Sequence, residues 1–325
     1  MSIATRSVLP VLFLLVSALP AAAQVVCGDV IPAGANVVLT ADLNCPSDDP
    51  ALTVTGPANV DMAGFLVTCD YDGPDPNGPT GILLDAKGVK LSNGVVERCA
   101  DNLVVAGTGG HKIENIVSRS ASAHGILVNS DKNKLKNIAA NDNVGEDGRG
   151  LMVLGNKNKF ENITAYRNGS DGMFVAGDGN QVRRAVFARN QTDGLELSGD
   201  GNKAKDCFVT DNATEGIDIV GNGNKVEKSI ITRAGDNDEL DDPALEIEGD
   251  GNQVKNNFIS DNIRVGILAL PGASNTKISK NVVLGNPDFD LQDEAVGGTC
   301  GSNQWKGNTF SISSAEGNPS PACIE

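Results

Sequence analysis

A repeat with a fixed period of 22 residues constrains this chain more than any other feature. Gly172, Gly194 and Gly216 lie 22 residues apart, and each opens a unit with an apolar–x–apolar triplet followed by a Gly-Asx-Gly-Asn turn. A period of this length indicates a solenoid, in which each repeat stacks on the next. Equivalent triplets, two of them preceded by insertions (142–149 and 235–243), are headed by Gly81, Asn102, Gly125, Gly150, Gly172, Gly194, Gly216, Ala244 and Gly266.

The triplets alternate with a period of two residues, as β-strands do. Leu195 and Leu197, for example, lie on one face of their strand, and Glu196 lies on the other. Strands that return every 22 residues stack in parallel and bury their apolar face inside the solenoid. We therefore predict an all-β fold, a right-handed parallel β-helix, which is a single-stranded solenoid of about ten coils, each rising ~4.8 Å.

Glycine and asparagine recur in the turns of the repeat, where tight corners need a positive φ. One asparagine occupies an equivalent position in successive coils. We expect these residues to stack as a ladder in which each side-chain amide bonds the next. The predicted ladder contains Asn133, Asn158, Asn180, Asn202, Asn224, Asn252 and Asn275.

The repeat units resemble those of the right-handed β-helix superfamily that includes pectate lyases, polygalacturonases, alginate epimerases and periplasmic accessory proteins. The two end segments, from Cys27-Gly-Asp to Cys45-Pro and from Asp290-Leu-Gln-Asp to Cys323-Ile, resemble those of uncharacterised secreted bacterial members. The resemblance covers nearly the whole chain after residue 23 and implies the fold. It implies no single activity, because this fold hosts many functions.

The N-terminus has the pattern of a signal peptide over residues 1–23. Arg6 precedes the apolar stretch Val8–Leu19, and a small-residue cleavage site, Ala21–Ala23, follows it. The apolar stretch is too short for a membrane span, which needs ~20 residues. We therefore expect a secreted or periplasmic protein without a membrane span. The remaining chain divides into an N-terminal cap segment (24–50), the parallel β-helix (51–291) and a C-terminal capping tail (292–325).

Seven cysteines in an exported chain suggest disulfides. Equivalent cysteines one coil apart lie about 4.8 Å from each other, within the Cα range of a disulfide. Cys207 is left over at a position where other coils have small residues, so we expect it to be buried rather than reactive. The predicted disulfides are Cys27–Cys45, Cys69–Cys99 and Cys300–Cys323.

The charge of the chain limits its partners. The sequence has 42 acidic and 26 basic side chains, a formal net charge of −16 at pH 7. Such a charge opposes binding to nucleic acid, so we expect no nucleic acid partner. It fits an exported protein that stays soluble. We also expect a monomer. A polysaccharide or a cell-surface component is the expected partner. Binding of a polyuronate would require a local basic patch or a bridging cation.

The middle residue of each triplet should point outward and form a stripe along the solenoid. Its apolar part, Leu127, Met152 and Phe174, is a candidate binding surface together with Arg149. Its acidic part supplies three stacked carboxylates, which are also the candidate catalytic residues: Glu196, Asp218 and Glu246. The full stripe is Val104, Leu127, Met152, Phe174, Glu196, Asp218, Glu246 and Leu268.

Stacked carboxylates need compensation, because two of them ~5 Å apart repel by roughly 3 kcal/mol at an effective dielectric constant of 20. Ca²⁺ suits such hard oxygen ligands. Its expected ligands are Glu196, Asp218 and Glu246 with Asp241 and Asp242 from the insertion, although no cofactor is required by the sequence. The alternative is a solvated acidic face that aids solubility.

The sequence contains no recognisable catalytic motif, so three functions stay open. The chain is a module that binds a glycan or a surface partner along the stripe, a polysaccharide lyase or glycoside hydrolase that uses the stacked carboxylates, or a structural surface protein. Glu196 and Asp218 in neighbouring coils match the carboxyl separation of retaining glycosidases, ~5 Å. That separation follows from the stacking of any β-helix, so it discriminates weakly.

Overall fold

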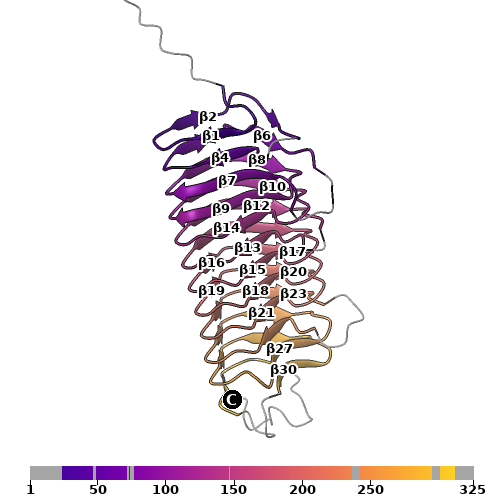
Figure 1. Ribbon diagram of the computed structural model, residues 1–325. Coiled ribbons are helices and arrows are strands. Elements are labelled where there is room, and N and C mark those ends of the chain that lie inside the picture. Colours follow the sequence, from indigo (N-terminus) through magenta and orange to yellow (C-terminus); the bar gives the residue numbers. More distant parts are fainter. Residues whose placement is uncertain are drawn as a thin grey trace, which may run out of the picture.

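The computed structural model describes residues 24–46, 49–71, 73, 77–145, 147–235, 242–294 and 301–311. These residues form an elongated column of stacked β-coils (Figure 1) and include no α-helix. None of the described segments is a helix that is long and apolar enough to cross a membrane. The predicted signal peptide lies outside the described residues, as do Asp241 and the predicted Cys300–Cys323 disulfide.

One strand of every coil belongs to a parallel sheet of 12 strands, here called sheet A, so the solenoid makes about 11 turns. This confirms the predicted parallel β-helix. The strands of sheet A in spatial order are β1 (Asp29–Ile31), β4 (Leu52–Val54), β7 (Thr80–Lys87), β9 (Asp101–Gly109), β11 (Ile126–Val128), β13 (Leu151–Val153), β15 (Met173–Val175), β18 (Leu195–Leu197), β21 (Ile217–Ile219), β24 (Leu245–Ile247), β27 (Val265–Ala269) and β30 (Phe289–Asp293).

The rest of each coil forms two further parallel faces, called B1 and B2 in chain order. Four long strands bend from B1 into B2: β8 (Lys90–Glu97), β10 (Lys112–Arg119), β12 (Lys134–Asn141) and β14 (Lys159–Tyr166). The other strands of B1 are β2 (Asn36–Val38), β5 (Asn59–Asp61), β16 (Gln181–Arg183), β19 (Lys203–Lys205), β22 (Lys225–Glu227), β25 (Gln253–Lys255), β28 (Lys277–Ser279) and β31 (Gln304–Lys306). Those of B2 are β3 (Leu43–Asn44), β6 (Leu66–Thr68), β17 (Val186–Ala188), β20 (Phe208–Thr210), β23 (Ile230–Thr232), β26 (Phe258–Ser260) and β29 (Val282–Leu284).

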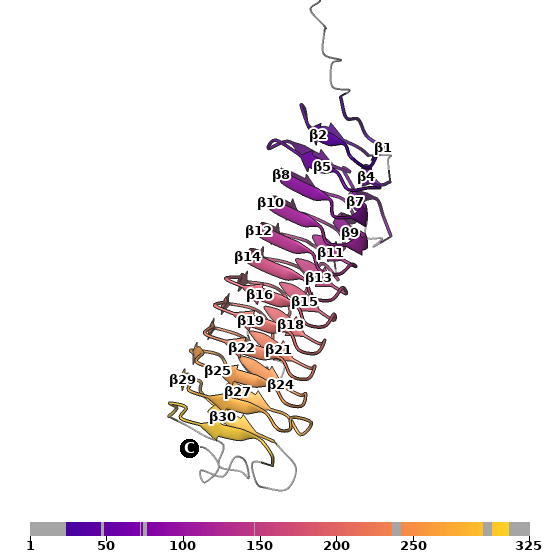
Figure 2. The same ribbon diagram turned by 90° about the vertical axis from the view of Figure 1, so that its left-hand side faces the viewer.

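Figure 2 shows face B1 and sheet A side by side, each with its strands stacked along the column. The 24–50 segment contributes β1, β2 and β3, which pair with β4, β5 and β6 as the first coil. In the 292–325 segment, β31 pairs with β28 and extends face B1. Both end segments therefore continue the sheets of the solenoid.

The corners explain the repeat signature. Residues between B1 and B2 have positive φ, as at Asn115 (57°) and Asp206 (56°), and so do residues between B2 and sheet A, as at Arg189 (54°). The glycine before each sheet A triplet lets the backbones of neighbouring coils approach each other closely. A Cβ on Gly194 would lie 2.6 Å from the carbonyl oxygen of Gly216 in the next coil. These positions therefore recur every 22 residues.

The core is the interior of the solenoid, filled by inward residues from all three faces. The first and third residues of each sheet A triplet, such as Leu195 and Leu197, are fully buried. Phe160 and Phe187 are the largest fully buried side chains. Because each coil contacts its neighbours through parallel backbone hydrogen bonds and these stacked side chains, the core is continuous along the column.

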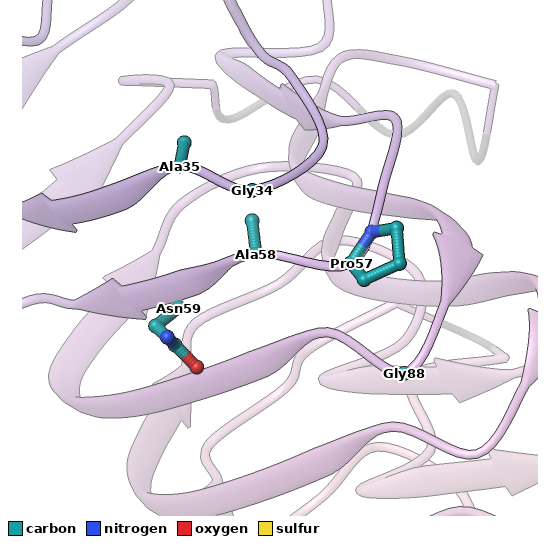
Figure 3. Close-up of a pocket in the computed structure, with 6 residues that line it drawn as sticks. All are labelled: Gly34, Ala35, Pro57, Ala58, Asn59 and Gly88. Carbon is teal, nitrogen blue, oxygen red and sulfur yellow. The ribbon is translucent and has the colours of Figure 1, made fainter.

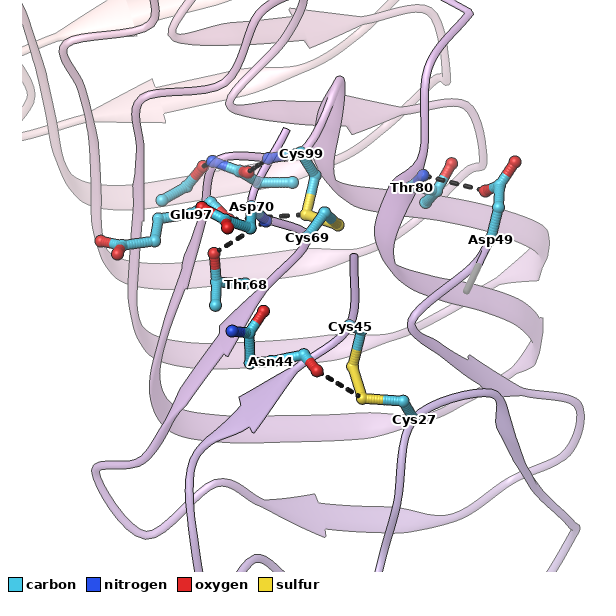
Figure 4. The surroundings of a disulfide bond; sticks show 12 residues. Cys27, Asn44, Cys45, Asp49, Thr68, Cys69, Asp70, Thr80, Glu97 and Cys99 are labelled. Carbon is cyan, nitrogen blue, oxygen red and sulfur yellow. Dashed lines mark hydrogen bonds between the residues drawn. A yellow bond between two sulfur atoms is a disulfide. The ribbon is translucent and has the colours of Figure 1, made fainter. Parts of the chain in front are cut away.

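Two disulfides fasten the first coils, as Figure 4 shows. Cys27 joins Cys45 within the first coil, with Cα atoms 5.4 Å apart, and Cys69 joins Cys99 between neighbouring coils, with Cα atoms 4.9 Å apart. Both predictions are confirmed. Cys207 is free and buried, and burial raises its thiol pKa to about 11. The prediction that Cys207 is buried is confirmed.

The predicted asparagine ladder forms, but its donors differ from the prediction. Each amide oxygen accepts a hydrogen bond of 2.7–2.8 Å from the backbone N–H of the equivalent residue one coil earlier, between Asn133 and Asn252. The prediction that Asn275 continues the ladder is wrong. Gln253 pairs with Lys277, so Thr276 occupies that position.

A second ladder was not predicted and does consist of amide-to-amide hydrogen bonds. It lies at the corner between B2 and sheet A, where every member is buried. The Nδ2 atoms of Asn143, Asn168 and Asn190 donate to the Oδ1 atoms of the next residues along the column, at 2.7–2.9 Å. The last acceptor of this run is Asn212. Such chains satisfy the polar groups of the buried corner.

Candidate functional site

The outer face of sheet A carries columns of side chains, because a strand places alternate residues on the same face. The middle residues of the triplets are in register from coil to coil and form the predicted stripe. Leu127, Met152 and Phe174 are partly exposed, and Glu196, Asp218 and Glu246 follow them directly. The prediction that Leu268 points outward at the end of the stripe is wrong, because this side chain is buried.

A second column of polar residues runs beside the stripe, three positions before each middle residue. Backbone hydrogen bonds between coils place its members next to one another. It begins with His124, whose Nδ1 lies 2.8 Å from Oδ1 of Asp101. The column then contains Arg149, Asp171, Asp193 and Glu215.

Arg149 connects the two columns at the boundary between the apolar and acidic parts of the stripe. Its Nε donates to Oδ2 of Asp171 at 2.9 Å, and its guanidinium lies over the ring of Phe174, 4.9 Å from the centroid. Its Nη1 lies 3.6 Å from Oδ1 of Asp147. The structure therefore places Arg149 beside Phe174.

Burial raises the pKa of carboxyl groups throughout the acidic part. It raises the pKa of Asp193 to about 9, with a hydrogen bond to the Glu215 carboxyl as the next cause. Burial, followed by repulsion from Asp193 and Glu246, raises the pKa of Asp218 to about 8. The pKa of Glu246 rises to about 7, again through burial and then the charge of Glu248. These groups hold protons near neutral pH unless a cation compensates them.

Burial also raises the pKa of Glu196 and of Glu215. Hydroxyl groups partly counter this effect: Ser198 donates a hydrogen bond to Glu196, and Thr214 donates to Asp193. The Oδ1 atom of Asp218 is buried and has no hydrogen-bond partner among the described residues. The cluster therefore retains an oxygen atom that no donor among the described residues satisfies.

Three carboxylates form a compact group. One oxygen from each of Asp171, Asp193 and Glu196 lies within 4.8 Å of the others. Because Ca–O distances are about 2.3–2.6 Å, two ligands of one calcium ion are at most about 5 Å apart. Hard carboxylate oxygens at this separation fit Ca²⁺.

The other predicted metal ligands are not part of this compact group. Asp218 and Glu246 continue the stripe beyond Glu196. Asp242 lies close enough for its charge to raise the pKa of Glu246. Asp241 is outside the described residues. The compact group thus contains Glu196 but joins it to two carboxylates from the neighbouring column.

Sequence reasoning missed Asp171 and the hydroxyl groups of Ser198, Thr192 and Thr214. Thr192 donates a hydrogen bond to Asp171. The signal for Asp171 was present, since it precedes Asp193 by one period of 22 residues.

A hollow of about 180 Å³ lies far from this cluster, at the corner between the first coils. Figure 3 shows its lining of small, uncharged residues. Its lining has no ionisable side chain. The lining residues are Gly34, Ala35, Pro57, Ala58, Asn59 and Gly88.

Residues 80–232 match the family model described as the right handed beta helix region. No curated protein is similar enough in sequence to match the chain. The A-module of mannuronan C-5 epimerase AlgE4 from Azotobacter vinelandii is similar in structure, with a TM-score of 0.57 and 15% identity, over 91% of this chain and 90% of that chain.

Two further solved structures are similar over most of this chain. Pectate lyase Pel9A has a TM-score of 0.53 and 16% identity, over 85% of this chain and 74% of its own. The Dettilon tailspike protein has a TM-score of 0.64 and 13% identity, over 86% of this chain and 62% of its own. Identities this low establish a shared fold and leave the activity open. Residues 80–232 therefore have the sequence pattern of the right-handed β-helix family, and the chain has the right-handed parallel β-helix fold that pectate lyase Pel9A shares.

Proposed function

We propose that this chain is an exported protein that binds a linear polysaccharide along the outer face of sheet A, with Ca²⁺ held by the acidic cluster. The observation that carries the proposal is the compact group of Asp171, Asp193 and Glu196, whose oxygen atoms lie within 4.8 Å of one another beside Arg149. The bound ion would neutralise these carboxylates and offer coordination positions to sugar oxygens.

The electrostatics of the cluster support a cation. Five neighbouring carboxyl groups have a raised pKa, and burial is the first cause for each. A divalent ion removes the unfavourable energy of ionising them together. Asp218 adds a buried oxygen without a hydrogen-bond partner. The donor set consists of oxygen atoms, which Ca²⁺ prefers.

The apolar part of the stripe supports a polysaccharide as the ligand. Leu127, Met152 and Phe174 form a partly exposed strip one residue wide along three coils. Such a strip fits the C–H faces of successive sugars in an extended chain. Mannuronan and pectate, the polymers in the names of two similar structures, support the same ligand class. The two disulfides support an exported protein, since disulfides persist in oxidising compartments.

Calorimetric titration of EDTA-treated protein with Ca²⁺ tests the proposal. Heat of binding is expected for the wild type and should be lost in Asp193→Asn/Glu196→Gln. The matched control is Glu114→Gln/Asp206→Asn, which removes two exposed charges from the B1 side and should retain binding. If the wild-type protein bound no Ca²⁺, the proposed calcium site would be wrong.

Polysaccharide binding is then measured by affinity electrophoresis in gels that contain polygalacturonate, with and without Ca²⁺. Retardation should depend on Phe174 and Arg149. A Phe174→Ala variant that migrates like the wild type would contradict a role of the stripe in binding.

Catalysis by a lyase or a hydrolase is the second candidate. It is favoured by the register of Glu196 and Asp218 in adjacent coils, a geometry that allows two carboxyl groups to act on one glycosidic bond. The raised pKa of Glu246, about 7, adds a group suited to proton transfer at neutral pH. Release of unsaturated products or new reducing ends, lost in Asp218→Asn while binding persists, would establish an enzyme. Absence of binding and turnover in every form would favour a structural protein.

A further inference from the structure

Face B1 carries a column of stacked lysines that the acidic site does not use. Lys90, Lys112, Lys134 and Lys159 occupy one outward position in four consecutive coils and are directly in register. All four are exposed. These residues are called the lysine column. Figure 2 shows their strands, β8, β10, β12 and β14, on a different face of the column from sheet A.

The same position stays free of acidic residues farther along the solenoid. Gln181 follows Lys159 in register, and Lys203 and Lys225 follow Gln181. Gln253 and Lys277 come next. A chain with a net charge of −16 thus presents a line of lysines, interrupted by Gln181 and Gln253, on one of its faces.

Ion pairs among the described residues do not account for the four residues of the lysine column. Among the described residues, the lysine column has no salt bridge, whereas Lys203 pairs with Glu227 at 2.8 Å. Like charges directly opposite each other on neighbouring strands are destabilising. Lysines also protect exposed sheet edges, but these strands are paired on both sides. Repulsion within the lysine column therefore lowers the stability of the fold, and no contact among the described residues offsets it.

We propose that the lysine column is a second binding surface, which binds a linear polysaccharide with a carboxylate on each sugar. The lysines recur at the strand spacing of about 4.8 Å, a repeat similar to the length of one sugar in an extended chain. Each ammonium group has three donors and accepts any approach direction of a carboxylate. A polyanion laid parallel to the solenoid axis would meet one cation per coil.

The composition of the face favours an acidic glycan over a nucleic acid. Single-stranded nucleic acids bind to basic grooves in which bases stack on aromatic side chains. The outward positions of the described B1 strands, on either side of their buried middle residues, contain no aromatic residue. Binding here rests on charge alone and needs no cation, in contrast to the proposed site on sheet A. The two surfaces can therefore be tested separately.

The experiment measures binding of fluorescent polygalacturonate to the mature chain (residues 24–325) in EDTA at low salt, by fluorescence anisotropy. We expect binding that weakens steeply with salt, as in other polyelectrolyte complexes. Replacing the four lysines by glutamine should raise the Kd at least tenfold and make the salt dependence shallower. Glutamine is a conservative choice, because this chain itself has Gln181 and Gln253 at the same position. Arginine at all four positions should restore binding.

A matched variant removes four cations from the opposite corner: Arg98→Gln, Arg167→Gln, Arg189→Gln and Arg233→Gln, all at positive-φ positions. It should bind like the wild type. Equal losses in both variants, no loss in the lysine variant, or no wild-type binding in EDTA would each overturn the proposal. Equally tight binding of single-stranded DNA would overturn the assignment to polysaccharide. Asp193→Asn/Glu196→Gln should bind normally in EDTA, which separates this surface from the calcium site.

Discussion

The Nε atom of Arg149 lies 2.9 Å from Oδ2 of Asp171, and the same guanidinium covers the ring of Phe174. The side chain of Asp171 is 5% exposed, and that of Arg149 is 21% exposed. This ion pair therefore differs from the exposed pairs at the corners of the solenoid. The pair holds the guanidinium of Arg149 at the point where the apolar strip meets the acidic cluster.

Replacing Arg149 by glutamine should lower the free energy of unfolding by about 1–3 kcal/mol, because a buried carboxylate loses a charged hydrogen-bond donor. Urea unfolding measures the loss. Asp171→Asn in the same background should recover part of it, since the unpaired charge is gone. Arg167→Gln is the control, because Arg167 and its partner Asp142 are both exposed and their pair should matter little. A double variant as unstable as the single one would contradict this account.

Stability should fall as pH rises through the titration range of the acidic cluster. A carboxyl with a raised pKa keeps its proton in the folded state at a pH where the unfolded chain has lost it. Unfolding then releases protons, so the free energy of unfolding decreases with pH. The window runs from about pH 4 to the folded values of Asp218 and Asp193, about 8 and about 9.

Thermal unfolding in EDTA between pH 5 and pH 9 checks this prediction. The Tm should decrease across the range, by roughly 2–4 °C for each kcal/mol lost. Asp218→Asn should flatten the profile, because the amide does not ionise. Ca²⁺ should raise the Tm more at pH 9 than at pH 5. A Tm that rises steadily from pH 5 to pH 9 in EDTA would contradict the raised pKa values.

The period of 22 residues was sufficient to predict the fold and the stripe. A constant period fixes which residues of successive strands are neighbours, so Glu196 and Asp218 had to stack once the solenoid was inferred. Glu246 follows an insertion, and its place in the stripe came from the apolar triplet Leu245–Ile247. The disulfide Cys69–Cys99 was predicted from equivalent positions in neighbouring coils, although the two cysteines are 30 residues apart. Where the coil length changes, the period alone does not set the register. The coils around Asn275 are longer, and a shift of one residue placed Thr276 in the ladder instead.

The rest of the site depends on side-chain orientation, which periodicity does not determine. Arg149 follows an insertion, and its contact with Asp171 depends on the path of that segment. The lysine column is a different case, since Lys90, Lys112 and Lys134 recur at the period and were visible in the sequence. The prediction followed the apolar triplets of sheet A and did not extend the same register to face B1.

Removing the Cys69–Cys99 disulfide should destabilise the first coils. The bond joins residues 30 positions apart, and closing a loop of this length in the unfolded chain contributes about 3–4 kcal/mol. Cys69→Ala/Cys99→Ala should therefore unfold at lower urea concentration, with earlier proteolysis near residue 70. Cys207→Ala is the control for thiol chemistry and should change stability less. Unchanged unfolding of the double variant would show that stacking alone holds these coils.

Replacing Asn190 in the buried amide ladder should destabilise the protein strongly, because this side chain is hydrogen-bonded to both neighbouring coils. Its Oδ1 accepts from Nδ2 of Asn168 at 2.9 Å, and its own Nδ2 donates to Oδ1 of Asn212 at 2.9 Å. Asn190→Ala leaves buried donors and an acceptor unsatisfied on both sides, at about 1–3 kcal/mol for each group. We expect a total loss of roughly 2–4 kcal/mol in urea unfolding.

Two comparisons separate the hydrogen bonds from the lost volume. Asn59→Ala removes an exposed amide bonded to Asn36 and should lower stability by less than about 1 kcal/mol. Asn190→Asp preserves the shape and the acceptor, but its carboxylate is buried and its pKa should rise. The loss in this variant should therefore shrink between pH 7 and pH 4, as the proton restores a donor. If Asn190→Asp were equally unstable at both pH values, the ladder would act through packing and the hydrogen-bond account would be wrong.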